Sequence, residues 1–290
     1  KRAFLAGKMT LTQAEAVMDV IGAAGKRELA FAHAQQNGAL FHRVQQISQG
    51  IVRSLGDLAA WADYPEDEIP AVTPESLHAA LQPVLEQLDS TLATYDYGRI
   101  LQSGVSAVIV GKPNVGKSTL FNLLSGSQRS IVTEIAGTTR DVVEEQIRLG
   151  NVTLRLSDTA GLRETEDVIE QMGVKIAEER LAQADLILAV FDTTRPLDDD
   201  DRRMLEQLPE KPVIAILNKS DQSAQLDTGE LEPHFSRVIT MAAREGSGLE
   251  QLQQAVEELF YQAEVTPELG IVANARQKQC LEQAREQVQL

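Results

Sequence analysis

One glycine-rich loop constrains the fold of this chain more than any other feature. The loop GKPNVGKS spans residues 111–118, directly after the apolar run VSAVIV (105–110) and directly before the helix-like run TLFNLLSG (119–126). It fits the pattern G-x-x-x-x-G-K-[ST] in the strand–loop–helix context of a phosphate-binding loop. Glycines let the backbone wrap around phosphate oxygens, and the amides at a helix N-terminus supply partial positive charge. The sequence therefore predicts an α/β fold with a phosphate site after its first strand.

Short apolar runs, alternating with helical stretches, predict the rest of the sheet. Further strands are expected at residues 142–149, 152–158, 186–192, 212–218 and 237–241. Gly150-Asn151 separates the first two of these runs, which predicts a hairpin. A mostly parallel, doubly wound sheet with one antiparallel edge is therefore expected.

The sequence on both sides of this region is helical in character. Helical runs are expected over residues 11–63 and, from an N-cap at Thr73 followed by Pro74, to about residue 102. After residue 260 the sequence is helical again. A stripe at three- and four-residue intervals predicts one core-facing helix face, made of Leu40, Val44, Ile47, Ile51, Leu55 and Leu58.

Residue types in and after the loop suit a nucleoside triphosphate with Mg²⁺. Lys117 would reach the β- and γ-phosphates, and the Ser118 hydroxyl would bind Mg²⁺. In DTAG (158–161), Asp158 can hold a water on Mg²⁺ and the Gly161 amide can contact the γ-phosphate. In EIAGTTRD (134–141), Thr139 can bind Mg²⁺ through its hydroxyl and the γ-phosphate through its amide. The loop residues predicted to contact the nucleotide are Gly111, Asn114, Val115, Gly116, Lys117, Ser118 and Thr119.

Two later segments predict that the base is guanine. NKSD (218–221) follows a predicted strand, and the Asp221 carboxylate offers two acceptors to the N1–H and N2–H₂ edge of guanine. A bidentate pair discriminates between bases by about 1–3 kcal/mol. Asn218 and Lys219 would brace the base and the loop. AARE (242–245) lies where GTPases carry a Ser-Ala-Lys loop; Ala242 and Arg244 replace the serine and the lysine, so only the backbone contact of Ala243 carries over.

These patterns together predict an α/β P-loop GTPase domain, with a mixed, mostly parallel sheet, inserted in an all-α helical domain. The expected domains are residues 1–102 for the N-terminal part of the helical domain, 103–262 for the GTP-binding domain, and 263–290 for a truncated return segment of the helical domain.

Composition excludes several other classes of protein. The net charge of −16 and the aromatic content of 4% disfavour broad electrostatic or stacking contacts with nucleic acid. The sequence contains no run of about 18 apolar residues, so no membrane-spanning helix is predicted. A single cysteine, Cys280, excludes an intramolecular disulfide and a thiolate metal cluster, and a cytoplasmic location is expected. The acidic run at residues 198–201 is predicted to be a solvated helix start.

Three stretches resemble known GTPases. GTTRD (137–141) resembles the bacterial GTPases of translation and ribosome maturation. KRAFLAGKMTLTQAEAVMD (1–19) and LRETEDVIEQMG (162–173) are similar to the tRNA wobble-uridine modification GTPases of the MnmE/TrmE family. The resemblance implies K⁺-stimulated GTP hydrolysis that drives pairing of G domains in a homodimer. It also implies a flavin-binding partner subunit, with tRNA as the substrate of the complex.

The resemblance further implies how hydrolysis proceeds without a glutamine after DTAG, where this chain has Leu162. In that family K⁺ occupies the place of an arginine finger, and the matching ligands here are Asn114, Thr133, Ile135 and Thr138. Glu170 matches the residue that orients the attacking water, although its surroundings alone would suggest a solvated glutamate. Lys117 and Thr139 complete the expected catalytic set.

Parts of the family pattern are not found in this sequence. The family carries a folate-binding, dimerising domain before the helical region and a cysteine motif at its end, so a folate site is expected only in that N-terminal domain. The sequence is therefore predicted to be a fragment that retains GTP hydrolysis. Two alternatives remain open: a GTP-dependent switch without meaningful turnover, which Leu162 favours, and a ribosome-assembly GTPase, which shares GTTRD and DTAG.

Overall fold

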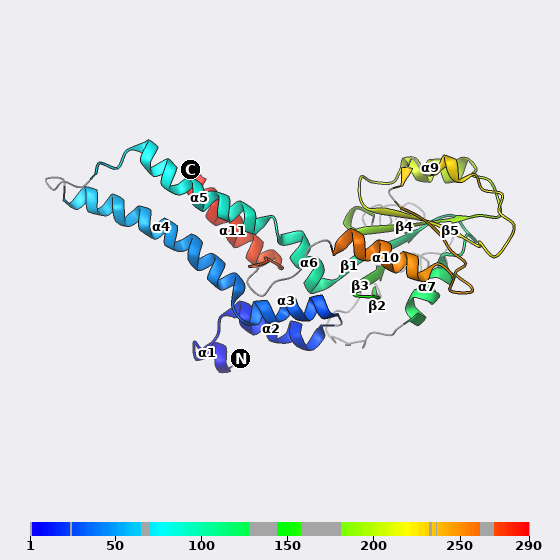
Figure 1. Cartoon of the computed structure of the whole chain (residues 1–290), viewed down its shortest axis with the longest axis horizontal. Coiled ribbons are helices and arrows are strands. Elements are labelled where there is room, and N and C mark those ends of the chain that lie inside the picture. Colours follow the sequence, from blue (N-terminus) through cyan, green and yellow to red (C-terminus); the bar gives the residue numbers. More distant parts are fainter. Residues whose placement is uncertain are drawn as a thin grey trace, which may run out of the picture. The chain divides into compact units, whose positions relative to one another are not determined.

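The computed structural model describes residues 2–23, 25–64, 70–127, 144–157, 181–231, 234–235, 237–261 and 270–289. The chain divides into two compact units (Figure 1). One joins Lys1–Ser103 with Ala263–Leu290, and the other is Gly104–Gln262. The first unit is therefore discontinuous in sequence, and the second lies between its two parts in the chain.

The second unit contains a six-stranded sheet in the order β2-β3-β1-β4-β5-β6. β2 pairs with β3 in antiparallel fashion, and every other neighbouring pair is parallel. The predicted fold class, a mostly parallel α/β sheet together with a helical domain, is confirmed. The strands are β1 (Val105–Val110), β2 (Glu144–Leu149), β3 (Val152–Ser157), β4 (Leu186–Asp192), β5 (Val213–Asn218) and β6 (Arg237–Thr240).

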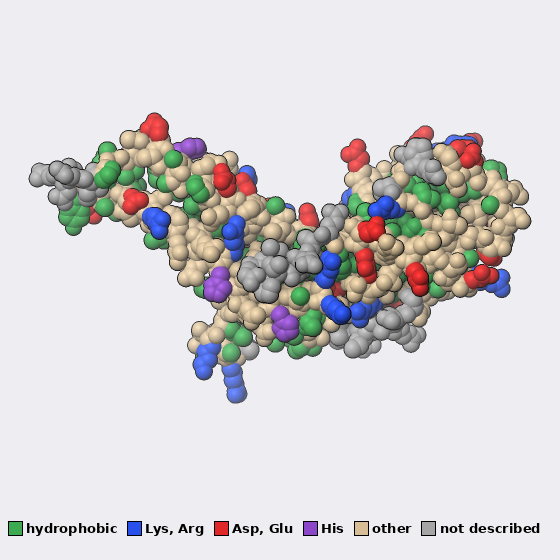
Figure 2. All heavy atoms as spheres, in the orientation of Figure 1, with side chains coloured by type: hydrophobic (Ala, Val, Ile, Leu, Met, Phe, Trp, Pro, Cys, Tyr) green, Lys and Arg blue, Asp and Glu red, His purple; other side chains and the backbone are tan. Residues whose placement is uncertain are grey.

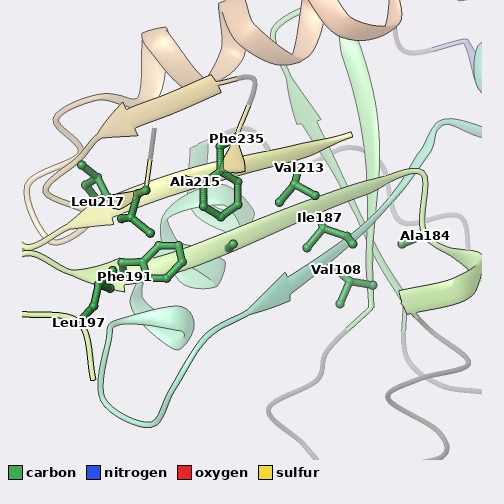
Figure 3. Close-up of a cluster of buried hydrophobic side chains, with 11 residues drawn as sticks. Val108, Ala184, Ile187, Phe191, Leu197, Val213, Ala215, Leu217 and Phe235 are labelled. Carbon is green, nitrogen blue, oxygen red and sulfur yellow. The ribbon is translucent and has the colours of Figure 1, made fainter. Parts of the chain in front are cut away.

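Apolar packing on the central strands holds this unit together. β4 and β5 are buried along their whole length, as expected for strands covered on both faces. Phe191 and Phe235 meet edge to face at a centroid distance of 5.8 Å in a cluster that also contains Val108 and Ile187 (Figure 3). The described α-helices of this unit are α7 (Lys117–Ser127), α9 (Asp199–Glu206) and α10 (Leu249–Phe260), and a short 3₁₀ helix spans Thr228–Glu230.

The helical unit is built from short and long helices, of which α4, α5 and α11 lie side by side (Figure 1). α4 and α11 both contact α5 (Figure 1). Leu40, Val84, Leu88, Val272 and Leu281 form their shared core. The described helices are α1 (Arg2–Leu5), α2 (Leu11–Gly22), α3 (Lys26–Gln36), α4 (Ala39–Asp63), α5 (Pro74–Leu92), α6 (Tyr95–Ser103) and α11 (Ala275–Gln289).

The start of α5 is confirmed, because Thr73 accepts a hydrogen bond from the Ser76 amide at 3.1 Å and Pro74 begins the helix. The predicted helical runs are helical in the structure, and each contains more than one helix. The first divides into α2, α3 and α4, since Gly25 is an N-cap and Gly38 takes a left-handed φ of 83°. The second divides at Ala93.

The predicted core stripe on α4 is only partly correct. Leu40 and Ile47 are buried, whereas Val44 is 39% and Leu55 is 59% exposed. Side chains spaced by three and four positions line about a third of a helix surface. α5 and α11 cover only part of that surface on α4, so the remaining apolar side chains are exposed. Apolar side chains accordingly appear on the surface of the α4–α5 hairpin (Figure 2). Across the part of the chain that the structure describes, no helix combines the length and apolar character of a membrane span.

Candidate nucleotide-binding site

Four neighbouring parallel strands end in polar sequence along one edge of the sheet. The predicted phosphate loop follows β1, NKSD closes β5, and AARE follows β6; β4 ends at Asp192 between β1 and β5. The carboxyl ends of parallel strands are where doubly wound sheets bind ligands. The topology therefore brings the predicted phosphate and base segments to the same edge.

The phosphate loop has a backbone that only glycine fits at two positions. Gly116 has a φ of 103°, and a Cβ there would lie 2.1 Å from Nδ2 of Asn218. Gly111 has a φ of 144°, and its Cβ would lie 2.5 Å from the carbonyl oxygen of Val190. Nζ of Lys117 donates to the carbonyl oxygens of Gly111 and Lys112, both at 2.6 Å. The lysine thus closes the loop from the first turn of α7 and places its ammonium group across it.

Asn114 lies at the exposed turn of this loop with a φ of 65°. Asparagine tolerates the left-handed region better than other residues that carry a Cβ. The predicted contacts Ser118 and Thr119 are also exposed, in the first turn of α7, whereas Val115 is fully buried and anchors the loop. The polar members of the loop therefore face solvent where a ligand can reach them.

The buried side chain of Asn218 connects all three predicted segments. Its Nδ2 donates to the carbonyl oxygen of Val115 at 2.8 Å, and its Oδ1 accepts from the amide of Ala243 at 3.0 Å. Asn218 is 2% exposed. Loss of either bond would leave a buried polar group unsatisfied, which costs about 1–3 kcal/mol. This asparagine thus fixes the spacing between the phosphate loop and the two base segments.

Residues at the end of β4, which the sequence patterns missed, bind the NKSD segment through hydrogen bonds and an ion pair. Thr193 donates both its amide, at 3.0 Å, and its hydroxyl, at 2.9 Å, to the carbonyl oxygen of Asn218. Asp192 pairs with Nζ of Lys219 at 2.5 Å. Burial alone would raise the pKa of Asp192, but hydrogen bonds from Lys219 and Thr194 outweigh it, so that pKa lies below its ordinary value. A polar Asp-Thr-Thr run closing a buried parallel strand was the available signal.

The acidic run at the start of α9 is not simply solvated, as predicted, but contacts the phosphate loop. The N-cap of α9 is Asp198, as expected of a helix start. Lys112 of the loop, however, forms ion pairs with both Asp198 and Asp201, and Asp201 is only 3% exposed. The hydrogen bond from Lys112 lowers the pKa of Asp198 to about 2. Lys112 therefore ties the loop to α9.

The remaining predicted residues are exposed, buried, or outside the described part of the chain. Asp221 and Arg244 are exposed, next to the buried Asn218 and Ala243. Ala242 is buried and bridges to Ser247. Ser118 and Asn114 are the described members of the predicted Mg²⁺ and K⁺ sets. Outside the described residues lie Thr133, Ile135, Thr138, Thr139, Asp158, Gly161, Leu162 and Glu170.

Comparison with known proteins decides the family. A family model described as the MnmE helical domain matches residues 11–290. The chain belongs to the MnmE family. The sequence resemblance to this family is therefore confirmed.

Curated MnmE relatives align along most of the chain. The protein named tRNA modification GTPase MnmE from Acetivibrio thermocellus is 38% identical over 287 residues, which cover 98% of this chain and 62% of the relative. The protein of the same name from Geobacter metallireducens is 44% identical over 261 residues, covering 90% of this chain and 57% of the relative. The chain thus spans about three fifths of the length of these MnmE proteins.

Solved structures align with a smaller part of this chain. Aquifex aeolicus Era bound to GDP and AlF₄⁻ is 31% identical, covers 55% of this chain and 58% of its own, and has a TM-score of 0.42. The G domain of the T. maritima FeoB iron transporter is 29% identical, covers 55% of this chain and 99% of its own, and has a TM-score of 0.40.

Proposed function

We propose that this MnmE family member binds GTP with Mg²⁺ and hydrolyses it to GDP and phosphate. The observation that carries the proposal is the clasp made by Asn218, which spaces the phosphate loop, NKSD and AARE along one sheet edge. A loop that binds phosphates and a segment that reads guanine must be held at a fixed separation to take one nucleotide. Membership in a family whose named relatives are GTPases supports the same reading.

The described residues fit the phosphates of such a nucleotide. The cradle depends on Gly111 and Gly116, where a side chain would meet Val190 or Asn218. Lys117 would exchange its backbone carbonyl partners for phosphate oxygens, and Ser118 would offer its hydroxyl to Mg²⁺ together with Thr139 and, through water, Asp158. Bound Mg²⁺ supplies positive charge to the β- and γ-phosphate oxygens. In the reaction, water attacks the γ-phosphorus and the bond to the β–γ bridging oxygen breaks.

Guanine would be read by Asp221. Its exposed carboxylate lies a short turn after the buried Asn218. The carboxylate oxygens are therefore presented at the sheet edge, while Asn218 fixes the backbone that leads to them. Adenine offers no matching pair of donors on that edge. The Ala243 amide is already engaged by Oδ1 of Asn218. This bond sets the position of AARE, where the backbone of Ala243 would contact the base.

The finer mechanism rests on the family resemblance. Glu170 would orient the attacking water, and K⁺ bound by Asn114, Thr133, Ile135 and Thr138 would neutralise charge that develops between the phosphates. The exposed, left-handed Asn114 is compatible with this role because its side chain is available at the loop surface. Pairing of two G domains in a homodimer would complete the ion site.

The biological setting is likewise proposed from the relatives. Their printed name is tRNA modification GTPase, and this chain covers only part of their length. We place the chain as the GTPase portion of a cytoplasmic complex that modifies the wobble uridine of tRNA, with a flavin-binding partner subunit. A folate site is proposed only for the family's N-terminal domain.

The test is GTP turnover in K⁺ and in Na⁺ at matched ionic strength, over a range of protein concentrations. Faster turnover in K⁺, rising more than linearly with protein, is expected, and Asn114→Ala should remove the K⁺ advantage while GTP affinity holds. Slow turnover that ignores the cation, with GTP binding intact, would instead support the switch without hydrolysis. Binding of ATP as tight as that of GTP would overturn the proposed guanine site.

A further inference from the structure

The ion pair between Asp192 and Lys219 stands apart from the surface ion pairs of this domain. Asp192 is 9% exposed and lies opposite Asn218 in the β4–β5 register. Its Oδ1 accepts from the Thr194 amide at 3.0 Å and from the Thr194 hydroxyl at 2.7 Å, while Oδ2 pairs with Nζ of Lys219 at 2.5 Å. Both oxygens of the carboxylate are therefore engaged.

Lys219 is held in a conformation that a free lysine would rarely adopt. Its φ is 66°, in the left-handed region. A non-glycine residue there costs about 1–3 kcal/mol and persists only when its surroundings determine it. The surroundings are visible here: Thr193 fixes the carbonyl oxygen of the preceding Asn218, and Asp192 fixes the end of the side chain. Asp192, the last residue of β4, and Thr193 directly after it thus anchor consecutive residues of NKSD.

The bent backbone of Lys219 leads directly into the turn that carries Asp221. Gln222 donates its amide to the carbonyl oxygen of Lys219 at 3.0 Å, which closes that turn. Farther along, the amides of Gln225 and Leu226 return to the carbonyl oxygen of Thr193. The turn therefore begins and ends on Asp192 and Thr193, and the position of its carboxylate depends on these two residues.

We infer that Asp192 is a positioning residue for guanine recognition, which acts by fixing Lys219 and, through it, the turn that presents Asp221. The inference rests on the proposed function, because it takes the ligand to be a guanine nucleotide. The competing explanation is that the pair only stabilises the sheet edge. The two differ in their consequences for base preference.

The test uses the whole 290-residue chain, with Mg²⁺, and titrations of fluorescent GDP and IDP. IDP lacks the 2-amino group, which in GDP would donate a hydrogen bond to Asp221. Asp192→Asn keeps the shape of the side chain but removes its charge, and we expect about tenfold weaker GDP binding and a smaller preference for GDP over IDP. Glu258→Gln is the matched control, since Glu258 pairs with Arg237 at the surface of the same domain at 2.8 Å. It should change neither quantity.

A double-mutant cycle separates positioning from simple stabilisation. If Asp192 acts through Lys219, then Asp192→Asn combined with Lys219→Met should lose no more GDP affinity than the weaker-binding single variant. Additive losses, or an Asp192→Asn variant with unchanged GDP affinity and base preference, would overturn the inference alone. Absence of GDP binding by the unmodified chain would overturn the proposed function as well. Lys219→Met breaks the same pair from its more exposed end. Should Asp192→Asn fail to fold, an unchanged preference for GDP over IDP in Lys219→Met would overturn the inference.

Discussion

Asn218 and Val115, 103 positions apart in sequence, are joined by a buried hydrogen bond of 2.8 Å from the side-chain amide to the carbonyl oxygen. The donor is the side chain that also accepts from Ala243, so its amide orientation is fixed by both partners. An aspartate at this position would keep the acceptor but would direct a second oxygen at Val115.

Asn218→Asp is therefore expected to destabilise the sheet unit by about 1–3 kcal/mol and to weaken GDP binding. Urea unfolding and GDP titration measure the two effects. Asn122→Asp is the matched control, because Asn122 is exposed on α7. Equal stabilities of the two variants would contradict the clasp.

Glu170→Ala should slow GTP turnover by at least a hundredfold while GTP affinity is retained, if Glu170 orients the attacking water. The measurement is single-turnover hydrolysis at saturating GTP in K⁺. Glu166→Ala, in the same acidic stretch, should behave like the unmodified chain. Equal rates in the two variants would remove Glu170 from the mechanism.

Lys112→Met should make the sheet unit more sensitive to acid. The pKa of Asp198 falls from 3.8 to about 2 because Lys112 bonds the charged carboxylate. This contribution to stability is fully present above the unfolded pKa and is lost as the pH falls through the folded pKa. Acid unfolding of Lys112→Met should therefore begin at higher pH than in the unmodified chain. Arg203→Met, which removes an exposed pair with Asp200 on the same helix, should shift the midpoint less.

Asp19→Asn should stabilise the helical unit at neutral pH. Burial, opposed by a hydrogen bond from Gln102 and helped by Glu15, raises the pKa of Asp19. For a carboxyl group whose pKa is raised by folding, the stabilising contribution is fully present below the unfolded pKa and is lost as the pH rises through the folded pKa. The gain in melting temperature from the neutral side chain should accordingly be larger at pH 7 than at pH 4. A gain independent of pH would point to a cause other than charge.

Gly98→Ala should damage the helical unit, whereas Gly56→Ala should not. A Cβ at Gly98 of α6 would lie 2.1 Å from the carbonyl oxygen of Val272, and one at Gly56 of α4 meets nothing within 4 Å. Overpacking typically costs about 1–3 kcal/mol, while replacing a glycine inside an open helix gains about 0.5–1 kcal/mol. Chemical unfolding that ranked the two variants in the opposite order would contradict the packing of α6 on the segment around Val272.

The strands were more predictable from sequence than the helices. The buried strands β1, β4 and β5 are continuous apolar runs, and their ends agree with the predicted ends to within one residue. The helical segments, in contrast, were predicted only as long runs, and the breaks at Gly25 and Gly38 were not placed within them. The C-cap Asn37 and the left-handed Gly38, with its φ of 83°, separate α3 from α4.

The site divides in a similar way. Loop motifs predict Lys117, Asn218 and Asp221 because their spacing is local. Asp192 and Asp201 could not be found by spacing, since each acts on a lysine far away in sequence that the fold brings close. An acidic side chain looks solvated in a sequence whenever its basic partner belongs to another segment.

The division of the helical unit between the two ends of the chain has a consequence for biosynthesis. Val272 and Leu281 cover Leu40 and Leu88, yet they are translated after the entire sheet-bearing unit. On the ribosome, α4 and α5 must therefore wait with their inner face exposed while Gly104–Gln262 emerges and folds. Domains fold as units during synthesis, and waiting apolar surface is open to chaperones and to misassembly. The order of translation thus makes the helical unit, although it begins first, the last part of this chain to be finished.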